Sequence, residues 1–595
     1  MSRRTVRALP AGLIVLTIAL AMSPSFGQGT NDLGESRQER WSSTGQEDQE
    51  SGLDAAGQAV LGVELGTSSN SSDGFIVVGP NVRVNALQQE RFGRSETTVA
   101  ASEDGQRIVV GWNDARGFCG PPFGRVCTPP NPPGLSGFGI STNRGISFTE
   151  GGAPPVFVVD GVPVFTRGDP WLAADRGGNT FFYANLAVDA RDANASLGVS
   201  VHRGRFQDGR FSWFDVHVFN AENAPRDFYD KEAITVEERG RLGVVTVTNF
   251  QELCNMPQNG SGQIELWRTN DGGTEWSGPV IVGPEMPDSV AACGNTGTLQ
   301  QSSVPAIGPD REVYVAWQQG PTFTATGVST DAKIVVARSL DGGLTFNQPQ
   351  TVAVINSMRN NPPVGYNRDR INDHPRIAVV TTGPNRGRVF VSFYSAVAPV
   401  TPASLSPCPP SLLLPTGSQC RAQRLTSSQV YVSHSDDLGL TWSTPVAVGP
   451  ALSDATGVKR WWPVVNVQRD GDVSVVYYES VEGQTTAGSC LVSLGRFGPA
   501  PGVPRFRTGL ARSSVNTYLA RSTDGGMTFD APVRVSSATS DWCATRTNIT
   551  PNYGDYIGGT RAAGRVLATW ADGRSGVADT FFAPILFRGT EAERP

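Results

Sequence analysis

The sequence predicts an all-β fold and, within that class, a β-propeller. Three observations lead to this prediction. Glycine and proline are frequent, with 68 and 42 residues among 595, and no long apolar stripe of helical period follows the N-terminal segment. Seven short segments resemble one another at intervals of about 60 to 90 residues, which suits four-stranded blades with their loops. A sharp turn motif recurs at a similar spacing.

Residues 1–27 have the composition of a secretory signal peptide. A basic start that ends at Arg7 precedes an apolar stretch over 11–22 and small residues up to Gly27. We therefore expect cleavage near Gln28 and a secreted protein, either extracellular or periplasmic. No later segment has the roughly 18 consecutive apolar residues that a membrane span needs, so we expect no stable membrane span. The alternative is an uncleaved N-terminal anchor.

Residues 28–74 and 75–595 differ in composition. The first range is rich in Ser, Gly, Gln, Glu and Asp, and it has too few large apolar side chains to offset the entropy of ordering. We expect it to be a disordered polar linker. From Phe75 onward, short β-rich runs alternate with Gly, Asn, Asp and Pro, which predicts a single propeller domain over 75–595.

The charge of the chain excludes several classes of function. The formal net charge is −6, the pI is about 5.5, and lysine and arginine never form a basic run, so we expect no nucleic-acid partner. Four histidines and the lack of any CxxC pattern argue against zinc and against a histidine-rich metal centre. We expect a monomer.

Eight cysteines, an even number, are expected to form disulfides in an exported protein. Eight cysteines allow about 105 pairings, and we favour the one that joins neighbours within loop-like insertions. The expected pairs are Cys119 with Cys127, Cys254 with Cys293, Cys408 with Cys420, and Cys490 with Cys543.

Each repeat begins with a short segment that we expect to be the innermost strand of a blade. A second strand follows each segment after a turn, and its apolar character is alternating or continuous, as in Ile108 to Trp112. The seven segments begin at Ser95, Asp169, Lys231, Val304, His374, Trp462 and Gly554.

The recurring turn has the pattern S-x-D-x-G-x-T-[WF]. The Asp can accept hydrogen bonds from the backbone of its own turn, the Gly can take a positive φ, and the aromatic residue can pack under the blade. Three copies match fully and begin at Ser339, Ser435 and Ser522. Two degenerate copies begin at Thr269 and Ser141.

This pattern is the Asp-box, and on its five copies the chain resembles the sialidase (neuraminidase) superfamily of Asp-box (BNR) repeat β-propellers. The resemblance implies a sialidase-like propeller whose turn carboxylates are structural and lie away from the active-site face. It also implies a glycoside hydrolase, similar to exo-α-sialidases, that acts on terminal acidic sugars of a glycan or glycoconjugate. The alternative is a non-catalytic extracellular propeller that binds glycan or protein and shares only the fold.

The number of blades is open between six and seven. The resemblance to sialidases implies six blades. This chain, however, has seven copies of the innermost segment, and we favour seven blades. The last repeat has little chain left for a fourth strand. Because propellers often close with a strand from the other end of the chain, we expect the range from Phe75 to Val84 to complete the final blade.

Ligands of propellers usually bind where the innermost strands begin. Carboxylates, aromatic residues and an arginine gathered at one mouth would suit a polar ligand. The alternative is that these groups bond to neighbouring blades and plug the channel. The residues expected there are Arg94, Asp169, Asp230, Lys231, Ser303, Asp373, His374, Trp461, Trp462, Tyr553, Asp555 and Tyr556.

The resemblance to sialidases assigns roles to several residues. Their first blade opens with [FY]-R-I-P, and Arg94 matches the carboxylate-binding arginine, although Ser and Glu replace Ile and Pro. An acidic-x-Arg pattern makes Asp114 a candidate acid/base and Arg116 a carboxylate ligand. Arg376 and Arg460 are candidates to complete a triad, because several planar guanidinium groups can enclose one carboxylate.

The family also uses a tyrosine nucleophile with a glutamate partner. Tyr553 or Tyr556 is the candidate nucleophile, and Glu232 is its candidate partner. Trp461 is a candidate to stack on a sugar ring, and the alternative is that it belongs to the core.

We expect no organic cofactor. Ca²⁺ at the channel mouth is a candidate, because oxygen ligands from several blades would suit it. The alternative is that Lys231 and Arg167 balance the acidic charge. The carboxylates concerned are Asp169, Asp230, Asp373 and Asp555.

Overall fold

The computed structural model describes most of the chain between residues 74 and 588. The described residues are 7–8, 70–71, 74–86, 92–119, 134–189, 198–221, 227–250, 262–283, 297–324, 327–328, 331–359, 361–366, 368, 371–400, 405–407, 419–421, 426–468, 471–482, 513–545, 549 and 551–588. In these ranges the chain is nearly all β and has no α-helix. Two short 3-10 helices, η1 (Ala115–Cys119) and η4 (Asp454–Thr456), are described there.

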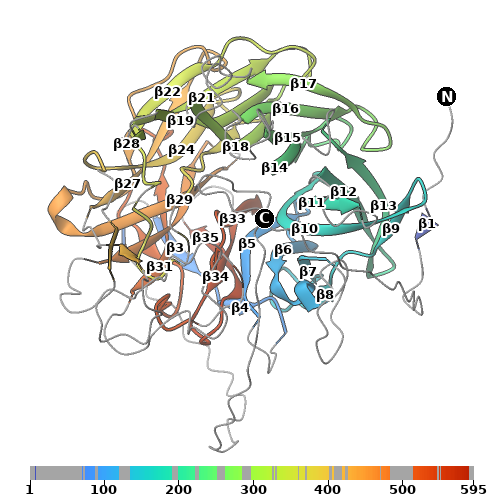
Figure 1. Cartoon of the computed structure of the whole chain (residues 1–595), viewed down its shortest axis with the longest axis horizontal. Coiled ribbons are helices and arrows are strands. Elements are labelled where there is room, and N and C mark those ends of the chain that lie inside the picture. The colour runs from blue at the N-terminus through green and yellow to red at the C-terminus, as the bar shows by residue number, and fades with distance from the viewer. Residues whose placement is uncertain are drawn as a thin grey trace, which may run out of the picture.

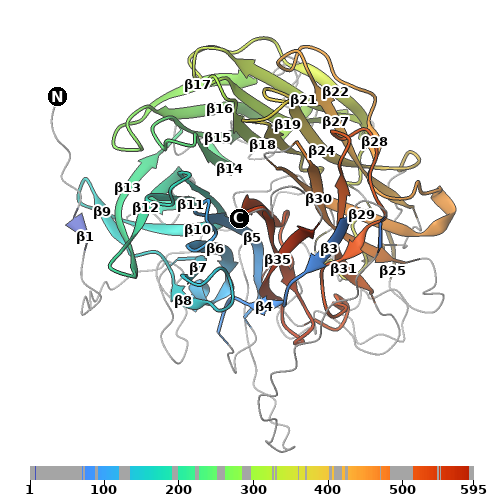
Figure 2. The same ribbon diagram turned by 180° about the vertical axis from the view of Figure 1, so that it is seen from behind.

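Seven antiparallel sheets surround a common axis, and each sheet is one blade (Figures 1 and 2). Blade 1 consists of β5 (Arg94–Ala101), β6 (Ile108–Asp114), β7 (Ser136–Ser141) and β8 (Thr149–Gly152). Blade 2 consists of β10 (Val162–Ala174), β11 (Phe181–Asp189), β12 (Gly198–Gln207) and β13 (Arg210–Phe219), with β9 (Phe157–Val159) beside β10 and β1 (Arg7–Ala8) beside β9. Blade 3 consists of β14 (Phe228–Val236), β15 (Gly243–Phe250), β16 (Gly262–Thr269) and β17 (Ser277–Gly283).

The other four blades follow the same order from the axis outward. Blade 4 consists of β18 (Gly297–Ile307), β19 (Val313–Thr324), β21 (Asp331–Ser339) and β22 (Gln350–Asn356), with β20 (Gly327–Val328) beside β19. Blade 5 consists of β23 (Arg376–Val379), β24 (Val389–Ala396), β27 (Ser428–Ser435) and β28 (Val446–Ala447). Blade 6 consists of β29 (Val458–Val467), β30 (Val473–Val481), β31 (Val515–Ser522) and β32 (Val533–Arg534).

Blade 7 is built from both ends of the propeller sequence. It consists of β33 (Gly558–Ala562), β34 (Arg565–Asp572), β35 (Asp579–Arg588) and β3 (Gly74–Val78), with β4 (Val82–Arg83) beside β35 and β2 (Asn70–Ser71) beside β3. Phe75 pairs with Arg588, and Val78 pairs with Ile585. The prediction that the segment starting at Phe75 completes the final blade is therefore confirmed, and so is the choice of seven blades over six.

The innermost strands form a closed ring. The strands β5, β10, β14, β18, β23, β29 and β33 each contact the next one, and β33 contacts β5. In each blade the second strand is almost entirely buried between neighbouring sheets, and β6 is buried at every residue. Strands covered on both faces are continuously apolar, which explains the apolar second strands in the sequence.

The two faces of the propeller are defined by the pairing register. Ala101, at the end of β5, pairs with Ile108, which pairs with Ser141. The repeated turn that starts at Ser141 therefore lies where the innermost strand ends. We call this side the turn face. We call the opposite side, where Arg94 at the start of β5 pairs with Asp114, the mouth face.

The repeated turn joins the third and fourth strands of five blades and has one set of hydrogen bonds. In the copy that starts at Ser339, Asp341 Oδ1 accepts from the backbone N–H groups of Leu344 and Thr345, at 3.0 Å each. Ser339 Oγ donates to Asp341 Oδ1 and accepts from the N–H of Gly343 at 2.8 Å. Asp271, Asp437 and Asp524 accept the equivalent bonds. The carboxylate thus saturates its own turn, as the sequence analysis expected.

The absence of this turn from blades 2 and 7 has a structural reason. In blade 2 the third and fourth strands are joined by Asp208 and Gly209, which have φ values of 51° and 74°. Two consecutive positive φ values are typical of the tightest hairpin turn. In blade 7 the fourth strand comes from the other end of the chain, so no turn is needed.

Arginines tie four of the five turns to the blade before them. Arg338 on β21 of blade 4 donates to the backbone oxygens of Asp437 and Leu438 in the turn of blade 5, at 3.2 and 3.0 Å. The same contact joins Arg203 to Gly272, Arg268 to Gly342 and Arg388 to Gly525. These contacts link five successive blades on the turn face.

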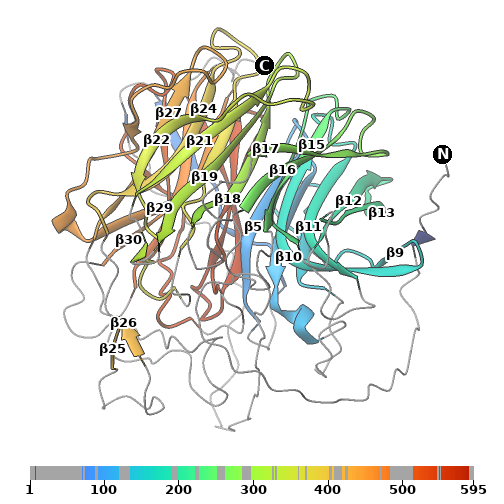
Figure 3. The ribbon, with the colours of Figure 1, turned by 45° about the horizontal axis from the view of Figure 1, so that its top comes forward.

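One described hairpin lies outside the blades. The hairpin of β25 (Leu405–Pro407) and β26 (Gln419–Arg421) stands apart from them (Figure 3). Among the described residues no helix is long and apolar enough to cross a membrane.

Cys543 is buried and disulfide-bonded. The side chains of the other seven cysteines lie outside the described residues, so the expected pairings stay predictions.

Candidate functional site

Each innermost strand contributes one residue to a ring around the axis at the mouth face. In β5, β10, β14, β18 and β29 the pairing with the second strand is interrupted by a bulge near the start. In each of these strands, the residue that occupies the bulge lies two positions before the point at which pairing with the second strand resumes. With the equivalent positions before β23 and β33, these residues form what we call the axial ring: Glu96, Asp169, Lys231, Ser302, His374, Trp462 and Tyr556.

Five members of the axial ring have a backbone that side-chain-bearing residues rarely adopt. Their φ values lie between 48° and 62°, in the left-handed region, and the residues are Glu96, Asp169, Lys231, Ser302 and Trp462. Each such residue costs on the order of 1 to 3 kcal/mol, and such conformations cluster at functional sites. The repeated bulge therefore places five residues at the same point of their strands at an energetic cost.

Lys231 is the centre of the charged side of the axial ring. Its Nζ lies 2.6 Å from Asp169 Oδ2, 2.9 Å from Asp555 Oδ2 and 3.7 Å from Glu96 Oε1. The Lys231 side chain is only 6% exposed, and Asp169, at 14%, is the most exposed of the four. Three carboxyl groups from blades 1, 2 and 7 thus meet one ammonium from blade 3.

A second cation and a tyrosine complete the contacts of Asp555. Arg368 donates to Asp555 Oδ2 at 3.0 Å, and the Tyr366 hydroxyl donates to Asp555 Oδ1 at 2.9 Å. Glu96 Oε2 accepts from Asn113 Nδ2 at 2.6 Å, and Glu96 Oε1 accepts from the Asp555 N–H at 3.0 Å. The buried carboxylates are therefore held in position from several blades.

The carboxyl groups of this cluster have opposite pKa shifts. Burial, and then the negative charge of Asp169, raise the pKa of Glu96 well above its usual range. Burial raises the pKa of Asp230 to about 6, because it and the charge of Asp169 outweigh the attraction of Lys231. Asp555 is as deeply buried, but Lys231 and Arg368 outweigh burial and lower its pKa. Carboxyls with pKa values pushed apart are typical of acid/base sites.

An aromatic layer adjoins the charged cluster. The Arg376 guanidinium lies over the Trp171 ring at 3.8 Å and donates to the Ile557 carbonyl at 2.6 Å. His374 stacks on Trp171, with the ring centroids 5.9 Å apart and an interplanar angle of 20°. The Tyr556 hydroxyl donates to the Pro170 carbonyl at 2.8 Å. Burial lowers the pKa of Arg376 to about 9.

The predicted residues Arg94, Asp114 and Arg116 lie together at the edge of blade 1. Arg94 pairs with Asp114 across β5 and β6, and Arg116 Nε donates to Asp114 Oδ1 at 2.8 Å. Arg116 also binds Glu150. Burial raises the pKa of Asp114, but the charges of Arg94 and Arg116 outweigh it, and the net pKa is lowered. Asp114 is thus arranged as an ionised partner of two arginines.

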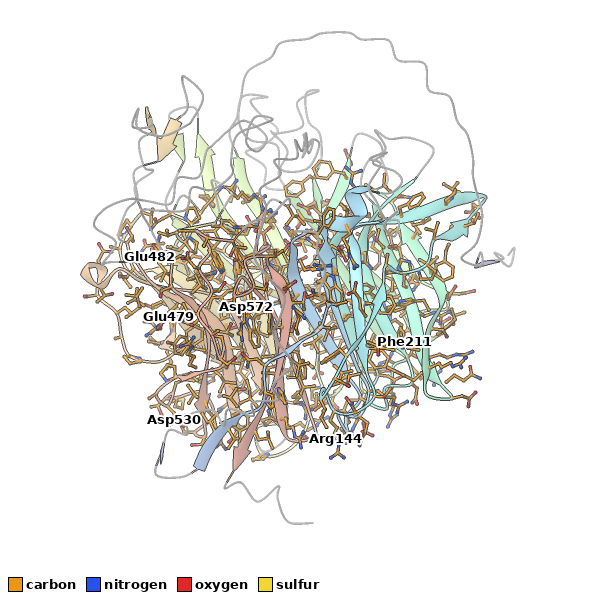
Figure 4. The ribbon with its side chains drawn as sticks, turned by 90° about the horizontal axis from the view of Figure 1, so that it is seen from below. Arg144, Phe211, Glu479, Glu482, Asp530 and Asp572 are labelled. Carbon is orange, nitrogen blue, oxygen red and sulfur yellow. The ribbon has the colours of Figure 1, made fainter. Side chains whose placement is uncertain are left out.

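The three arginines proposed for a triad have separate partners. Arg94 donates to the Phe92 carbonyl at 3.0 Å and lies 3.6 Å from Asp579. Arg376 has the Trp171 and Ile557 contacts given above. Arg460 donates to Glu479 Oε2 at 2.7 Å and to the Pro450 carbonyl at 2.8 Å. Figure 4 marks Glu479 on blade 6. No contact described here brings the three guanidinium groups to one point.

The remaining predicted residues are deeply buried. The Tyr553 hydroxyl donates to Thr545 Oγ1 at 2.6 Å, and its ring stacks on Trp542 at 3.9 Å. Trp461 is 1% exposed and packs edge-on against Trp542 at 5.5 Å. Neither carboxylate oxygen of Glu232 has a hydrogen-bond partner, and burial raises its pKa well above the usual range. Their catalytic and sugar-binding roles stay predictions.

The four carboxylates considered for Ca²⁺ do not form one group. Asp169 and Asp555 meet at Lys231, and Asp230 lies beside them. Asp373 is bound elsewhere, where it accepts from Ser357 and from the Met358 N–H at 3.0 Å. Among the described residues, no group of three or more His, Cys, Asp or Glu side chains is arranged to hold a metal ion. The Lys231 ammonium occupies the point where the carboxylates converge.

Sequence reasoning missed Glu96, Ser302 and Arg368 as mouth residues. The alignment of repeats assigned Ser95, Val304 and Gly554 to the position that Glu96, Ser302 and Tyr556 occupy, an error of one or two residues. The bulge adds a residue to the strand start, and nothing in the local sequence marks it. Arg368 has no counterpart in the other repeats, so repeat comparison could not find it.

Comparisons with known proteins provide fold-level likeness only. No family model matches the sequence, and no curated protein matches it. Among solved structures, an α-L-arabinanase of Penicillium chrysogenum complexed with arabinobiose is 10% identical at a TM-score of 0.38, covering 67% of this chain and 94% of that one. A GH93 α-L-arabinofuranosidase of Fusarium graminearum has the same TM-score at 11% identity, covering 67% and 92%.

A sialidase of Trypanosoma rangeli in complex with sialic acid is also similar. It is 11% identical at a TM-score of 0.36, and the match covers 84% of this chain and 72% of that one. TM-scores this low carry no functional information. The function of this chain is therefore argued from its axial ring.

Proposed function

We propose that this chain is an exported glycoside hydrolase whose active site is the charged side of the axial ring. The observation that carries the proposal is the pair Asp230 and Asp169. Burial and the charge of Asp169 raise the pKa of Asp230 to about 6, whereas Asp169 forms an ion pair with Lys231 at 2.6 Å. Asp169 is also the most exposed of the carboxylates paired with Lys231. Export rests on the signal peptide predicted over residues 1–27.

Two carboxyl groups are what most glycoside hydrolases require. One acid protonates the leaving oxygen of the glycosidic bond, and a second carboxylate takes a proton from the attacking water or attacks the sugar itself. In the proposed reaction, Asp230 donates its proton to the leaving oxygen as the bond to the anomeric carbon breaks. A water adds to that carbon and gives its proton to Asp169. An acid with a pKa near the working pH is suited to this exchange.

The identity of the sugar is a finer proposal. The terminal acidic sugar implied by the sialidase resemblance needs a carboxylate clamp from Arg94, Arg116, Arg376 and Arg460. It also needs Tyr553 or Tyr556 as nucleophile with Glu232. These roles stay untested predictions, and they define the second arm of the experiment.

The first experiment is hydrolysis of 4-methylumbelliferyl glycosides by the purified mature chain. The panel contains neutral hexoses and pentoses, a uronic acid and sialic acid. We expect turnover of at least one substrate and a loss of about 10² to 10⁴ in kcat for Asp230→Asn. The matched control is Asp572→Asn, which removes a buried carboxylate that pairs with Arg574 away from the axial ring. It should leave kcat unchanged.

Two results would redirect the proposal. Turnover of the sialoside that is lost in Arg94→Ala and Tyr556→Phe but kept in Asp230→Asn would assign catalysis to the sialidase-type residues. No turnover of any glycoside by a chain with intact fold would remove the hydrolase function.

A non-catalytic glycan- or protein-binding propeller is the second candidate. One observation favours it: Lys231, Asp169, Asp555 and Arg368 already satisfy much of one another's charge. Binding of glycans without hydrolysis, unchanged in Asp230→Asn, would support this candidate.

A further inference from the structure

The axial ring has a charged side and a neutral side. Blades 1 to 3 contribute Glu96, Asp169 and Lys231, which are paired as described above. Blades 4 and 5 contribute Ser302 and His374, whose innermost strands β18 and β23 contact each other. These two residues share the ring position but take no part in the hydrogen bonds and ion pairs of the charged cluster described above.

The polar atoms of the neutral side have no hydrogen-bond partner. Ser302 is 0% exposed and His374 is 3% exposed, yet the Ser302 hydroxyl and both nitrogens of the His374 imidazole are unpaired. Native proteins leave few buried polar atoms in this state, and each one needs an explanation. Here three such atoms come from adjacent blades at the same position of the axial ring.

Packing restricts how His374 can turn to find a partner within the protein. The imidazole is stacked on Trp171 at 5.9 Å and meets the Tyr556 ring edge-on at 5.5 Å. The Tyr556 hydroxyl is already committed to the Pro170 carbonyl. Ser302 has a positive φ of 62°, so its side-chain direction is set by the bulge. The groups are held in place rather than free to reorient.

The protonation of His374 determines which ligand chemistry fits. Burial, and then the charges of Arg376 and Lys231, lower the pKa of His374 well below its usual range, so the imidazole is neutral. A neutral imidazole offers one N–H donor and one nitrogen acceptor, and a serine hydroxyl also donates and accepts. Their complement is a group that both donates and accepts, which is an uncharged hydroxyl.

An anionic group fits this side poorly. A carboxylate accepts hydrogen bonds but donates none, so it would face the imidazole acceptor unpaired. It would also lie in the field of Asp169 and Asp555. The cations that act on His374 are Arg376 and Lys231. Lys231 already binds Asp169 and Asp555 at 2.6 and 2.9 Å, and Arg376 lies over the Trp171 ring at 3.8 Å and donates to the Ile557 carbonyl.

We propose that Ser302 and His374 form a subsite for an uncharged, hydroxyl-bearing sugar ring, so that the glycan recognised at the mouth ends in a neutral sugar. This inference rests on the proposed glycan function and specifies its substrate class. It does not depend on hydrolysis, because binding alone requires the subsite.

The test measures binding and turnover separately. The probes are methyl glycosides of glucose, galactose, mannose and arabinose, and the methyl glycosides of sialic acid and galacturonic acid, titrated calorimetrically into the mature chain. We expect a neutral glycoside to bind, and we expect Ser302→Ala to weaken it about tenfold, the loss of one hydrogen bond. His374→Phe keeps an aromatic ring on Trp171 but removes both nitrogens, and it should weaken binding by at least as much.

Ser474→Ala is the matched control. Ser474 is 1% exposed and its hydroxyl is also unpaired, but it lies on β30 at the turn-face end of blade 6. It should leave the affinity unchanged. If neutral glycosides bind and Ser302→Ala weakens them while no glycoside is hydrolysed, the subsite stands and the hydrolase proposal fails. Exclusive binding of acidic glycosides, no binding of any probe, or an unchanged affinity in both ring variants would overturn the subsite.

Discussion

At the residue scale, the axial ring shows how one backbone feature produces a polar site. A bulge places Glu96, Asp169 and Lys231 in the left-handed region, and their side chains meet within 3.7 Å. Burial makes isolated charge costly, so the acids are paired with Lys231 and Arg368 or have pKa values raised toward neutrality. The burial of the cluster also raises the pKa of Asp230 to about 6.

The pH dependence of hydrolysis follows from Asp230. The raised pKa of about 6 means that its carboxyl is protonated below that pH and ionised above it. If Asp230 is the acid, kcat/KM should fall as the pH rises through about 6, and the falling limb should be absent in the residual activity of Asp230→Asn. A rate that is flat between pH 5 and pH 8 would contradict the assignment.

Removal of Lys231 should destabilise the chain in a pH-dependent way. Lys231→Met leaves Asp169 and Asp555 without their shared cation, and uncompensated buried charge costs about 3 to 5 kcal/mol. Lys231 and Arg368 lower the pKa of Asp555, so in the parent chain its contribution to stability is present above its unfolded pKa and is lost as the pH falls. In the variant, the carboxylates bind protons more readily.

The expected result is a difference in the free energy of unfolding that is largest at neutral pH and shrinks as the pH falls toward the ordinary pKa of an aspartate, about 4. Urea denaturation at several pH values measures it. A difference that does not change with pH would show that the lost stability comes from packing rather than charge. Lys231→Arg is the control that keeps the positive charge.

At the element scale, the repeated turn and the arginine before it connect one blade to the next. Four of the five turns are saturated by their own carboxylate, and their backbone oxygens remain available to the preceding blade. Arg338 of blade 4 donates to two of these oxygens in the turn of blade 5. The motif is therefore both a hairpin closure and an attachment point, which explains its recurrence on the turn face far from the axial ring.

Loss of one such contact should weaken the propeller. Arg338→Ala removes two hydrogen bonds to the turn at 3.2 and 3.0 Å. Bonds made by charged groups contribute about 1.5 to 3 kcal/mol each, less where they are partly exposed, so we expect a loss of about 1 to 3 kcal/mol in urea denaturation. The control Arg386→Ala removes an exposed pair with Asp310 and should have no measurable effect. Equal stability of both variants would contradict the role of the turn contact.

At the scale of the whole molecule, closure depends on a strand from the N-terminal end of the described chain. β3 covers the edge of β35 through the pairs from Phe75 to Val78, and Ile76 is 5% exposed in the core. Without β3, the apolar edge of blade 7 would be open, and open edges promote aggregation. The ring of blades is thus held by contacts between residues more than 500 positions apart in the sequence.

Truncation tests this closure. A chain that begins at residue 80 lacks β3, and we expect it to aggregate or to unfold at a lower temperature without a cooperative transition. Deletion of residues 28–68 is the control, because the sequence analysis expects that range to be a linker outside the propeller. Light scattering and a thermal melt compare the two. Cooperative unfolding of the shorter chain at the parent temperature would contradict the closure.

The sequence by itself determined the class of fold, favoured seven blades over six and indicated how the last blade closes. Local patterns in the sequence indicate these features. The patterns are the apolar second strands, the turn residues with fixed roles, and the β-rich segment at Phe75 that belongs to no other blade. Local patterns suffice because each blade repeats the same short-range hydrogen bonds. They also marked five members of the axial ring, since Asp169, Lys231, His374, Trp462 and Tyr556 stand out in a comparison of repeats.

Only the tertiary structure decided how those residues are used. In blades 1 and 4 the bulge brings Glu96 and Ser302 to the ring position, one or two residues from where the comparison of repeats placed it. Arg368 enters the cluster from outside the repeats, and Arg94, Arg376 and Arg460 each find separate partners. Charge pairing and burial depend on which blades are neighbours around the ring, and no segment of the sequence contains that information alone.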